Sequence, residues 1–215
     1  MNISFIPNHG VDHLNSMLLD DNGFCRVLPA AVVNDIPRDS FRLWCGQNAI
    51  YLYPTLELVE YLTAFIDGRN AIEVGAGNGH LGNALGIPMT DSGMQTRPDI
   101  IAQYQVMGQA CTCPPDNVEI VDAVDAVEKY KPQVVIASWL THKWEPGMST
   151  GNMYGPDELK IIAGVDNYVH IGNDTIHWEK PCWSQPHQKH YHPWIVSRAG
   201  AKEQDHIAIW GIIRQ

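Results

Sequence analysis

The stretch Ala71-Ile-Glu-Val-Gly-Ala-Gly-Asn-Gly-His-Leu-Gly82 decides the fold of this chain. A short apolar run that carries one acidic residue, Glu73, stops at Gly75, Gly77 and Gly79. Glycine takes positive φ and lets a ligand approach the main chain, because it has no Cβ. The pattern predicts a strand that ends in a ligand-binding loop, with Glu73 facing the same crevice. The alternative is a tight turn that binds no ligand. Ordering three glycines costs backbone entropy, and such a turn would bind nothing that needs the space they leave.

Apolar periodicity on both sides of this stretch predicts alternating strands and helices. We expect helices within residues 54–66, 80–85, 97–108, 123–130 and 156–163, the first of them capped by Thr55. We expect strands over residues 71–74, 87–90, 117–121, 133–137 and 167–171. Such alternation is typical of an α/β fold with a mainly parallel sheet.

Two further segments complete the expected organisation. Residues 194–197 and 206–213 flank a polar turn and predict a C-terminal antiparallel hairpin. Residues 1–48, interrupted by Pro7, Pro29 and Pro37, are expected to be an irregular N-terminal extension or lid before a main domain over residues 49–215.

Composition excludes several classes of protein. The 215 residues are 45% hydrophobic and 18% charged, as in a globular domain. No apolar run approaches the roughly 18 residues of a membrane span, and Met1–Pro7 lacks a signal-peptide pattern, so we expect a cytoplasmic protein without a membrane partner. A formal charge of -10 argues against nucleic acid as the main partner. Five cysteines, an odd number, are expected to be reduced thiols.

The glycines allow two cofactor classes. Gly77, Gly79 and Gly82 satisfy the G-x-G-x-x-G pattern of dinucleotide-binding proteins. The longer run Glu73-Val-Gly-Ala-Gly-Asn-Gly79 resembles the first motif of class I S-adenosylmethionine (SAM) dependent methyltransferases. This resemblance implies a seven-stranded, Rossmann-like sheet with helices on both faces. It also implies that the loop wraps the amino acid part of SAM through Glu73, Gly75, Ala76, Gly77, Asn78 and Gly79.

Acidic and small residues follow the next expected strands, where open α/β sheets bind ligands. By the same resemblance, Asp91 faces the ribose of SAM and Asp122 faces the adenine. Ser92, Ala123 and Ser138 complete the expected cofactor-binding set. The alternative for each aspartate is a turn or a helix N-cap. The chain departs from the family pattern in its short helix after the glycine loop and in Pro88, which disfavours a central strand.

The segment Ser138–Trp144 lies where the family selects its acceptor. It lacks the Asn/Asp-Pro-Pro-aromatic signature of enzymes that methylate amino groups of nucleic acids, so we expect an O or N atom of an unidentified small molecule or protein. His142 is the candidate proton acceptor. Trp139, His170 and Asn173 are the candidate substrate contacts.

The segment from His170 to Trp194 is rich in imidazole and aromatic rings and has three interpretations. It is a substrate-facing loop, a packing layer over the hairpin, or a metal site. The residues available for a metal site are Cys182, His187, His190 and His192, with Cys111 and Cys113. Zinc ligands usually come in paired short spacings, which a lone Cys182 does not provide, so we expect no metal.

Taken together, the residues and the resemblance predict a SAM-dependent methyltransferase. One alternative is an NAD(P)-dependent oxidoreductase, because the same crevice and an acidic residue after the second strand suit a nicotinamide cofactor. The other is a non-catalytic SAM-binding protein with the same fold, since function lies in sites and not in folds.

Overall fold

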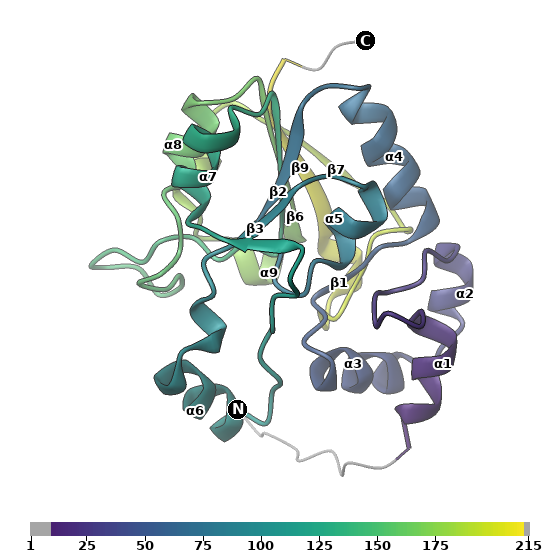
Figure 1. Ribbon diagram of the computed structural model, residues 1–215. Coiled ribbons are helices and arrows are strands. Elements are labelled where there is room, and N and C mark those ends of the chain that lie inside the picture. The colour runs from purple at the N-terminus through teal and green to yellow at the C-terminus, as the bar shows by residue number, and fades with distance from the viewer. Residues whose placement is uncertain (1–9, 213–215) are drawn as a thin grey trace.

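Seven strands form the central sheet, in the order β4-β3-β2-β5-β6-β9-β7 (Figure 1). The computed structural model describes residues 10–212. Neighbours among the first five strands pair in parallel, and β9 pairs antiparallel with both β6 and β7. The strands are β2 (Ala71–Val74), β3 (Met89–Asp91), β4 (Val118–Ile120), β5 (Val134–Ser138), β6 (Asn167–Asn173), β7 (Gln188–Tyr191) and β9 (Asp205–Gly211). This arrangement confirms the expected Rossmann-like methyltransferase fold.

Helices cover both faces of this sheet. The helices that follow the N-terminal region are α4 (Leu56–Ile66), α5 (His80–Leu85), α6 (Pro98–Val106), α7 (Ala123–Tyr130), α8 (Glu158–Ala163) and α9 (Asp174–His177). Val134 and Ile136 of β5 pack in one core cluster with α4, while Val135 and Ala137 pack in the other with α7 and α8. A central strand buried on both faces needs such a continuous apolar run.

Local signals explain several helix and strand boundaries. Thr55 caps α4, because its Oγ1 accepts a hydrogen bond from the backbone N–H of Leu58 at 3.4 Å. Asp122 caps α7 in the same way through the N–H of Val124 at 2.9 Å. Pro88 lies immediately before β3. Its carbonyl accepts a hydrogen bond from the N–H of Glu73 in β2 at 2.9 Å. Proline in that position removes no ladder donor.

The N-terminal region is helical, so the expectation of irregular structure was wrong for residues 10–48. It contains a short 3-10 turn (Asp12–Leu14) and helices α1 (Asn15–Leu18), α2 (Ala30–Asn34) and α3 (Arg38–Gln47). Pro29 and Pro37 directly precede α2 and α3, where proline starts a helix without losing a hydrogen bond. Pro7 and the rest of residues 1–9 lie outside the described residues.

A third core cluster joins this region to the rest of the chain. Phe41 and Trp44 of α3 pack with Tyr53 and Val196. Tyr53 belongs to β1 (Leu52–Tyr53) and Val196 to β8 (Val196–Ser197), which pair antiparallel as a separate two-stranded sheet. Residues on both sides of the expected boundary at residue 48 therefore share one core.

The C-terminal antiparallel pair is built from different segments than expected. Residues 194–197 do not pair with β9, because β8 pairs with β1 instead. The partner of β9 at the sheet edge is β7, from the histidine-rich segment. Its polar sequence Gln-Lys-His-Tyr suits an edge strand that meets solvent on one side. Residue 213, the expected end of the hairpin, lies outside the described part of the chain.

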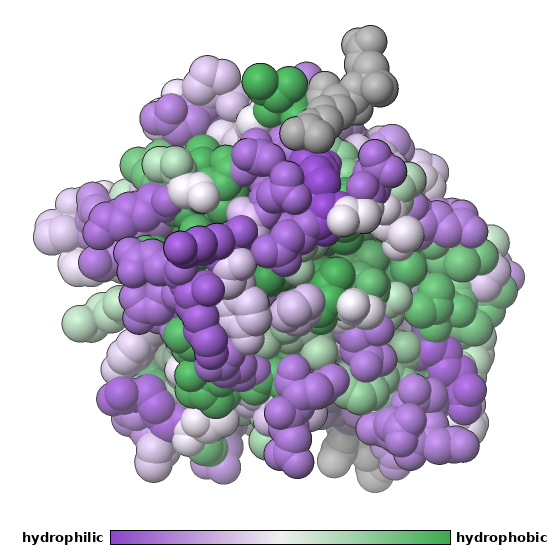
Figure 2. Space-filling model, turned by 45° about the horizontal axis from the view of Figure 1, so that its top comes forward, coloured by the Kyte–Doolittle hydropathy of each residue, from purple (hydrophilic) through white to green (hydrophobic). Residues whose placement is uncertain are grey.

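The surface is mixed in character. Figure 2 shows hydrophilic residues over much of one face, interspersed with smaller hydrophobic groups. Among residues 10–212, no helix combines the length and the apolar character that crossing a bilayer requires. All five cysteines are free thiols.

Candidate functional site

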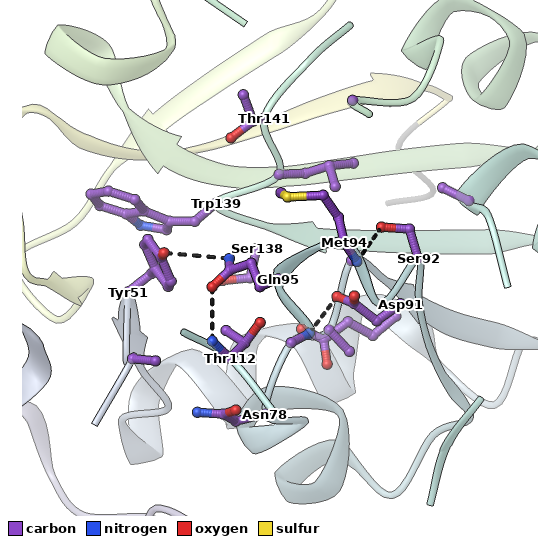
Figure 3. Close-up of a pocket in the computed structure, with 18 of the residues that line it drawn as sticks. Tyr51, Asn78, Asp91, Ser92, Met94, Gln95, Thr112, Ser138, Trp139 and Thr141 are labelled. Atoms are coloured by element: carbon purple, nitrogen blue, oxygen red, sulfur yellow. Dashed lines mark hydrogen bonds between the residues drawn. The ribbon is translucent and has the colours of Figure 1, made fainter. Parts of the chain in front are cut away.

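A pocket opens at the carboxyl ends of the parallel strands (Figure 3). Its lining comes from the glycine loop after β2, the loop after β3, the start of α7 and the loop after β5. Residues 49–52 and Tyr104 of α6 line it from the other side. In Figure 1, α3 and α6 lie beyond the sheet at this end. Open α/β sheets bind ligands at this position, where the strand order reverses beside β2.

The glycine loop has the backbone that its sequence predicts. Gly75 and Gly77 have φ of 64° and 55°, in the left-handed region that side chains disfavour. A Cβ on Gly75 would lie 2.4 Å from Leu140 Cδ1, and one on Gly77 would lie 2.9 Å from Thr112 Cγ2. Glycine is therefore needed both for the backbone conformation and for the close approach of these two side chains.

Asp91 ties the end of β3 to the glycine loop. Its Oδ2 accepts from the N–H of Gly77 at 2.8 Å, and its Oδ1 accepts from the N–H of Gly93 at 2.7 Å. Each carboxylate oxygen has capacity for a second donor. The carboxylate can therefore shape the loop and still accept from a ligand hydroxyl in the pocket.

Glu73 is a buried carboxyl group at the base of the pocket, only 2% exposed. Its Oε2 accepts from the backbone N–H of Gly82 at 2.7 Å. Burial raises the pKa of Glu73 to about 8, the Gly82 N–H acts in the opposite direction, and the charge of Asp91 raises it further. The group is thus largely protonated near pH 7, and a cation placed beside it would favour the ionised form.

The expected cofactor-binding residues gather in this pocket, with one exception. The lining includes Glu73, Gly75, Ala76, Gly77, Asn78, Asp91, Ser92, Asp122, Ala123 and Ser138. Gly79 does not line it and instead precedes α5, where a Cβ would lie 3.0 Å from Met89 Sδ. Asp122 serves as the N-cap of α7 while it lines the pocket, so the capping role does not remove its side chain from the pocket.

The charges of the lining have one sign. The carboxyl groups of Asp91 and Asp122 line the pocket, as does that of Glu73, which is largely protonated near pH 7 and would ionise beside a cation. No lysine or arginine among the described residues lines it. His80 also lines it, and burial lowers the pKa of its imidazole to about 4, so the ring is neutral near pH 7. The pocket therefore suits a ligand with positive charge better than one with negative charge.

The candidate proton acceptor and the candidate substrate contacts separate into two groups. Trp139 lines the pocket together with Ser138. His142, His170 and Asn173 are all buried and lie outside the lining set. Burial is the main cause that lowers the pKa of His142, and the positive charge of Lys180 lowers it further. The buried imidazole of His142 is neutral near pH 7, but it does not line the pocket.

His170 and Asn173 belong to the packing of β6. His170 lies against His177 and His206, with ring centroids 4.9 Å and 5.7 Å away, and burial lowers its pKa well below the ordinary value. Asn173 caps α9 through the N–H of Thr175 at 3.0 Å. A direct substrate contact for these two residues finds no support in their positions.

The histidine- and tryptophan-rich segment is mainly a packing layer. His187 stacks on Trp210, with centroids 5.1 Å apart, and His192 stacks on Trp194 at 4.3 Å. Cys182 is buried in the same core cluster as Trp210. Within the part of the chain that the structure describes, no group of three or more histidine, cysteine or acidic side chains is placed to hold a metal ion.

Several pocket residues were missed at the sequence level. They are Ala49, Ile50, Tyr51, Leu52, His80, Leu81, Met94, Gln95, Tyr104, Thr112, Asn152, Tyr154, Gly155 and Pro156, together with Leu140 and Thr141, which fall in the expected acceptor segment but were not named singly. Most come from segments that only the tertiary fold brings to the glycine loop. The one local signal was the position of Leu140 and Thr141, directly after a strand that ends at the pocket edge.

Comparisons with known proteins give only distant likenesses. No family model matches the chain, and no curated protein does so. A mutant form of MtNAS is similar over 85% of this chain and 68% of its own, with 16% identity and a TM-score of 0.40. Protein 1320 of Thermoplasma acidophilum is similar over 76% of this chain and 92% of its own, with 17% identity and a TM-score of 0.34. The chemistry of the pocket therefore has to follow from its own residues.

Proposed function

We propose that the chain binds SAM in this pocket and transfers its methyl group to an O or N atom of an acceptor. The observation that carries the proposal is the polarity of the lining: Asp91, Asp122 and the buried, largely protonated Glu73 line the pocket, with no lysine or arginine among the described lining residues. SAM carries a sulfonium, an ammonium and a carboxylate group, so its net charge is positive. NAD(P) carries a pyrophosphate, for which this lining offers no cationic side chain.

The proposed placement follows the order of the strands. Asp91 at the end of β3 would accept from the ribose hydroxyls, and Asp122 with Ala123 would face the adenine. The loop Gly75–Asn78 would hold the amino acid part, next to Glu73 and Ser138. Ser92 extends the ribose side of the site.

Methyl transfer from SAM requires little from the protein beyond the positioning of the methyl donor and the acceptor. SAM supplies an electrophilic methyl group and loses its positive charge in the transfer, so holding donor and acceptor in line provides much of the acceleration. The residues of the pocket bind and orient the two reactants. The proposal assigns no step to His142, since it does not line the pocket.

Thermal shift measurements with SAM, S-adenosylhomocysteine and NAD test the proposal. A ligand at about 100 times its Kd stabilises a protein by about 2.7 kcal/mol, which gives a measurable rise in Tm. We expect stabilisation by SAM and S-adenosylhomocysteine and none by NAD. The reverse pattern would support the oxidoreductase alternative and refute the proposal.

A matched pair of variants locates the ligand. Asp122→Asn keeps a side chain that caps α7 but removes the charge that would face the adenine, so SAM affinity should fall. Asp125→Asn changes an exposed aspartate of the same helix outside the pocket and should leave it unchanged. Equal affinity in both variants would contradict the placement. Release of S-adenosylhomocysteine from labelled SAM in cell extract then separates an enzyme from a binding protein.

A further inference from the structure

An uncharged surface forms the side of the pocket away from the proposed cofactor residues. We call it the aromatic wall and define it as Tyr51, Gln95, Tyr104 and Trp139, all of which line the pocket. Figure 3 shows Tyr51 and Trp139 together, across the pocket from Asp91. The wall contains no ionisable acid or base that is charged near neutral pH, in contrast to the carboxyl groups on the cofactor side.

The Tyr51 ring is held from behind. The Arg198 guanidinium lies over it at 3.7 Å from the ring centroid, and Arg198 is not among the residues that line the pocket. The backbone N–H of Arg198 donates to Tyr51 O at 3.0 Å, and its side chain donates to Gln109 at 3.2 Å. Trp139 contacts the ring from another side, with centroids 5.8 Å apart and planes tilted by 45°. A ring fixed in this way loses little entropy when a ligand packs on it.

The Tyr51 hydroxyl is also oriented. The backbone N–H of Thr112 donates to Gln95 Oε1 at 2.8 Å, which turns the amide so that its Nε2 donates to the Tyr51 hydroxyl at 3.5 Å (Figure 3). Burial and the neighbouring Tyr51 raise the pKa of Tyr104, so this phenol stays neutral. The wall thus combines flat apolar faces with neutral hydrogen-bonding groups.

We propose that the methyl acceptor is a planar, uncharged aromatic molecule with a hydroxyl or amine group, which packs against the aromatic wall. This inference rests on the proposed function. Aromatic side chains favour ring partners in stacked or edge-to-face contact. An anionic acceptor would find no cation on the wall, and a strongly cationic one would find no carboxylate there.

The transfer balances with this acceptor class. A lone pair on the acceptor O or N forms the bond to the methyl carbon, and the carbon–sulfur bond of SAM breaks with its electron pair remaining on sulfur. The sulfonium becomes a neutral thioether. As the new bond forms, the acceptor loses its O–H or N–H proton to solvent.

Equilibrium dialysis of the full chain with saturating S-adenosylhomocysteine tests the acceptor class. The probes are naphthol, its saturated counterpart decalol, and hydroxynaphthoic acid, which adds a negative charge to the planar ring. We expect naphthol to bind about two- to ten-fold more tightly than decalol, the size of one aromatic contact. The acid should bind more weakly than naphthol. Equal binding of naphthol and decalol, or a preference for the acid, overturns the inference.

Variants test whether the preference for naphthol over decalol depends on the aromatic wall. Tyr51→Leu should reduce naphthol binding by about two- to ten-fold and remove the preference over decalol. Tyr51→Phe keeps the ring and should keep the preference. Trp144→Phe alters a partly exposed tryptophan outside the pocket and should change neither. A naphthol preference that survives Tyr51→Leu contradicts the assignment.

The two proposals fail in different ways. A SAM thermal shift on the unsubstituted chain is measured first. If SAM does not stabilise the protein, the proposed function falls. If SAM stabilises it and naphthol is not preferred, only the acceptor class falls.

Discussion

Replacing Lys180 by methionine should be among the most destabilising single changes in the chain. The Lys180 and Glu158 side chains are 0% and 2% exposed, and Lys180 Nζ lies 2.6 Å from Glu158 Oε2. Lys180 Nζ also donates to Leu140 O at 2.7 Å, and Tyr168 donates to the other carboxylate oxygen of Glu158 at 2.5 Å. Methionine fills a similar volume but removes the donor to one oxygen of the buried Glu158 carboxylate and to the partly buried carbonyl of Leu140.

The expected loss follows from this geometry. Breaking one partner of a buried, hydrogen-bonded ion pair costs about 3–5 kcal/mol, because the remaining charge stays desolvated. Adding Glu158→Gln to Lys180→Met removes that charge and keeps an acceptor for Tyr168. A neutral unsatisfied group costs only about 1–3 kcal/mol, so the double variant should be more stable than the single one.

Urea unfolding followed by circular dichroism measures these differences. The matched control is Lys160→Met, which breaks an exposed pair with Asp157 at 3.9 Å and should cost about 0–1 kcal/mol. A loss for Lys180→Met no larger than for Lys160→Met would refute the reasoning. So would a double variant less stable than the single one, since the cost would then not arise from an unpaired charge.

Three further predictions concern single sites. Because the pKa of Glu73 is raised from 4.5 to about 8, its contribution to stability is complete below pH 4.5 and is lost as the pH rises through about 8. Glu73→Gln should therefore gain stability relative to the unsubstituted chain as the pH rises over this range in urea unfolding, and parallel pH profiles would contradict it. Burial lowers the pKa of His206 from 6.5 to about 4, so its contribution is present above pH 6.5 and is lost as the pH falls toward 4. His206→Gln should reduce the fall of Tm as the pH is lowered toward 4. An unchanged dependence of Tm on pH would contradict the burial argument. Thr55→Ala removes the cap of α4 and a 2.7 Å hydrogen bond to Trp194 O, and should lower the unfolding free energy by about 1–2 kcal/mol or slightly more, whereas Thr63→Ala on the exposed face of the same helix should have a small effect.

The sequence predicts the fold best where the determining signals are local. Helix α7 begins at the expected residue because Asp122 caps it, and it ends at the expected Tyr130, before Lys131 in the left-handed conformation. Strand β2 ends where Gly75 takes positive φ. The prolines at 29 and 37 misled the prediction, because the same residue interrupts one helix and starts another. Strand β7 was missed because its polar sequence owes its conformation to pairing with β9.

The candidate site divides in the same way. The acidic and glycine side of the pocket could be predicted because its residues lie at or just after the carboxyl ends of strands, and the topology brings those ends together. Of the aromatic wall, only Trp139 was predicted, because it directly follows β5. Tyr51 and Tyr104 lie in segments with no motif, and only the tertiary fold places them beside the glycine loop. His142 and His170 were chosen for their chemistry, and the structure uses both in its interior.

The pairing of β1 with β8 has a consequence for synthesis of the protein. Tyr51 directly precedes β1, and its carbonyl is bound by the N–H of Arg198, so one boundary of the pocket needs the last part of the chain. A nascent chain on the ribosome can present its glycine loop early, yet it cannot close the pocket until Arg198 has emerged from the exit tunnel.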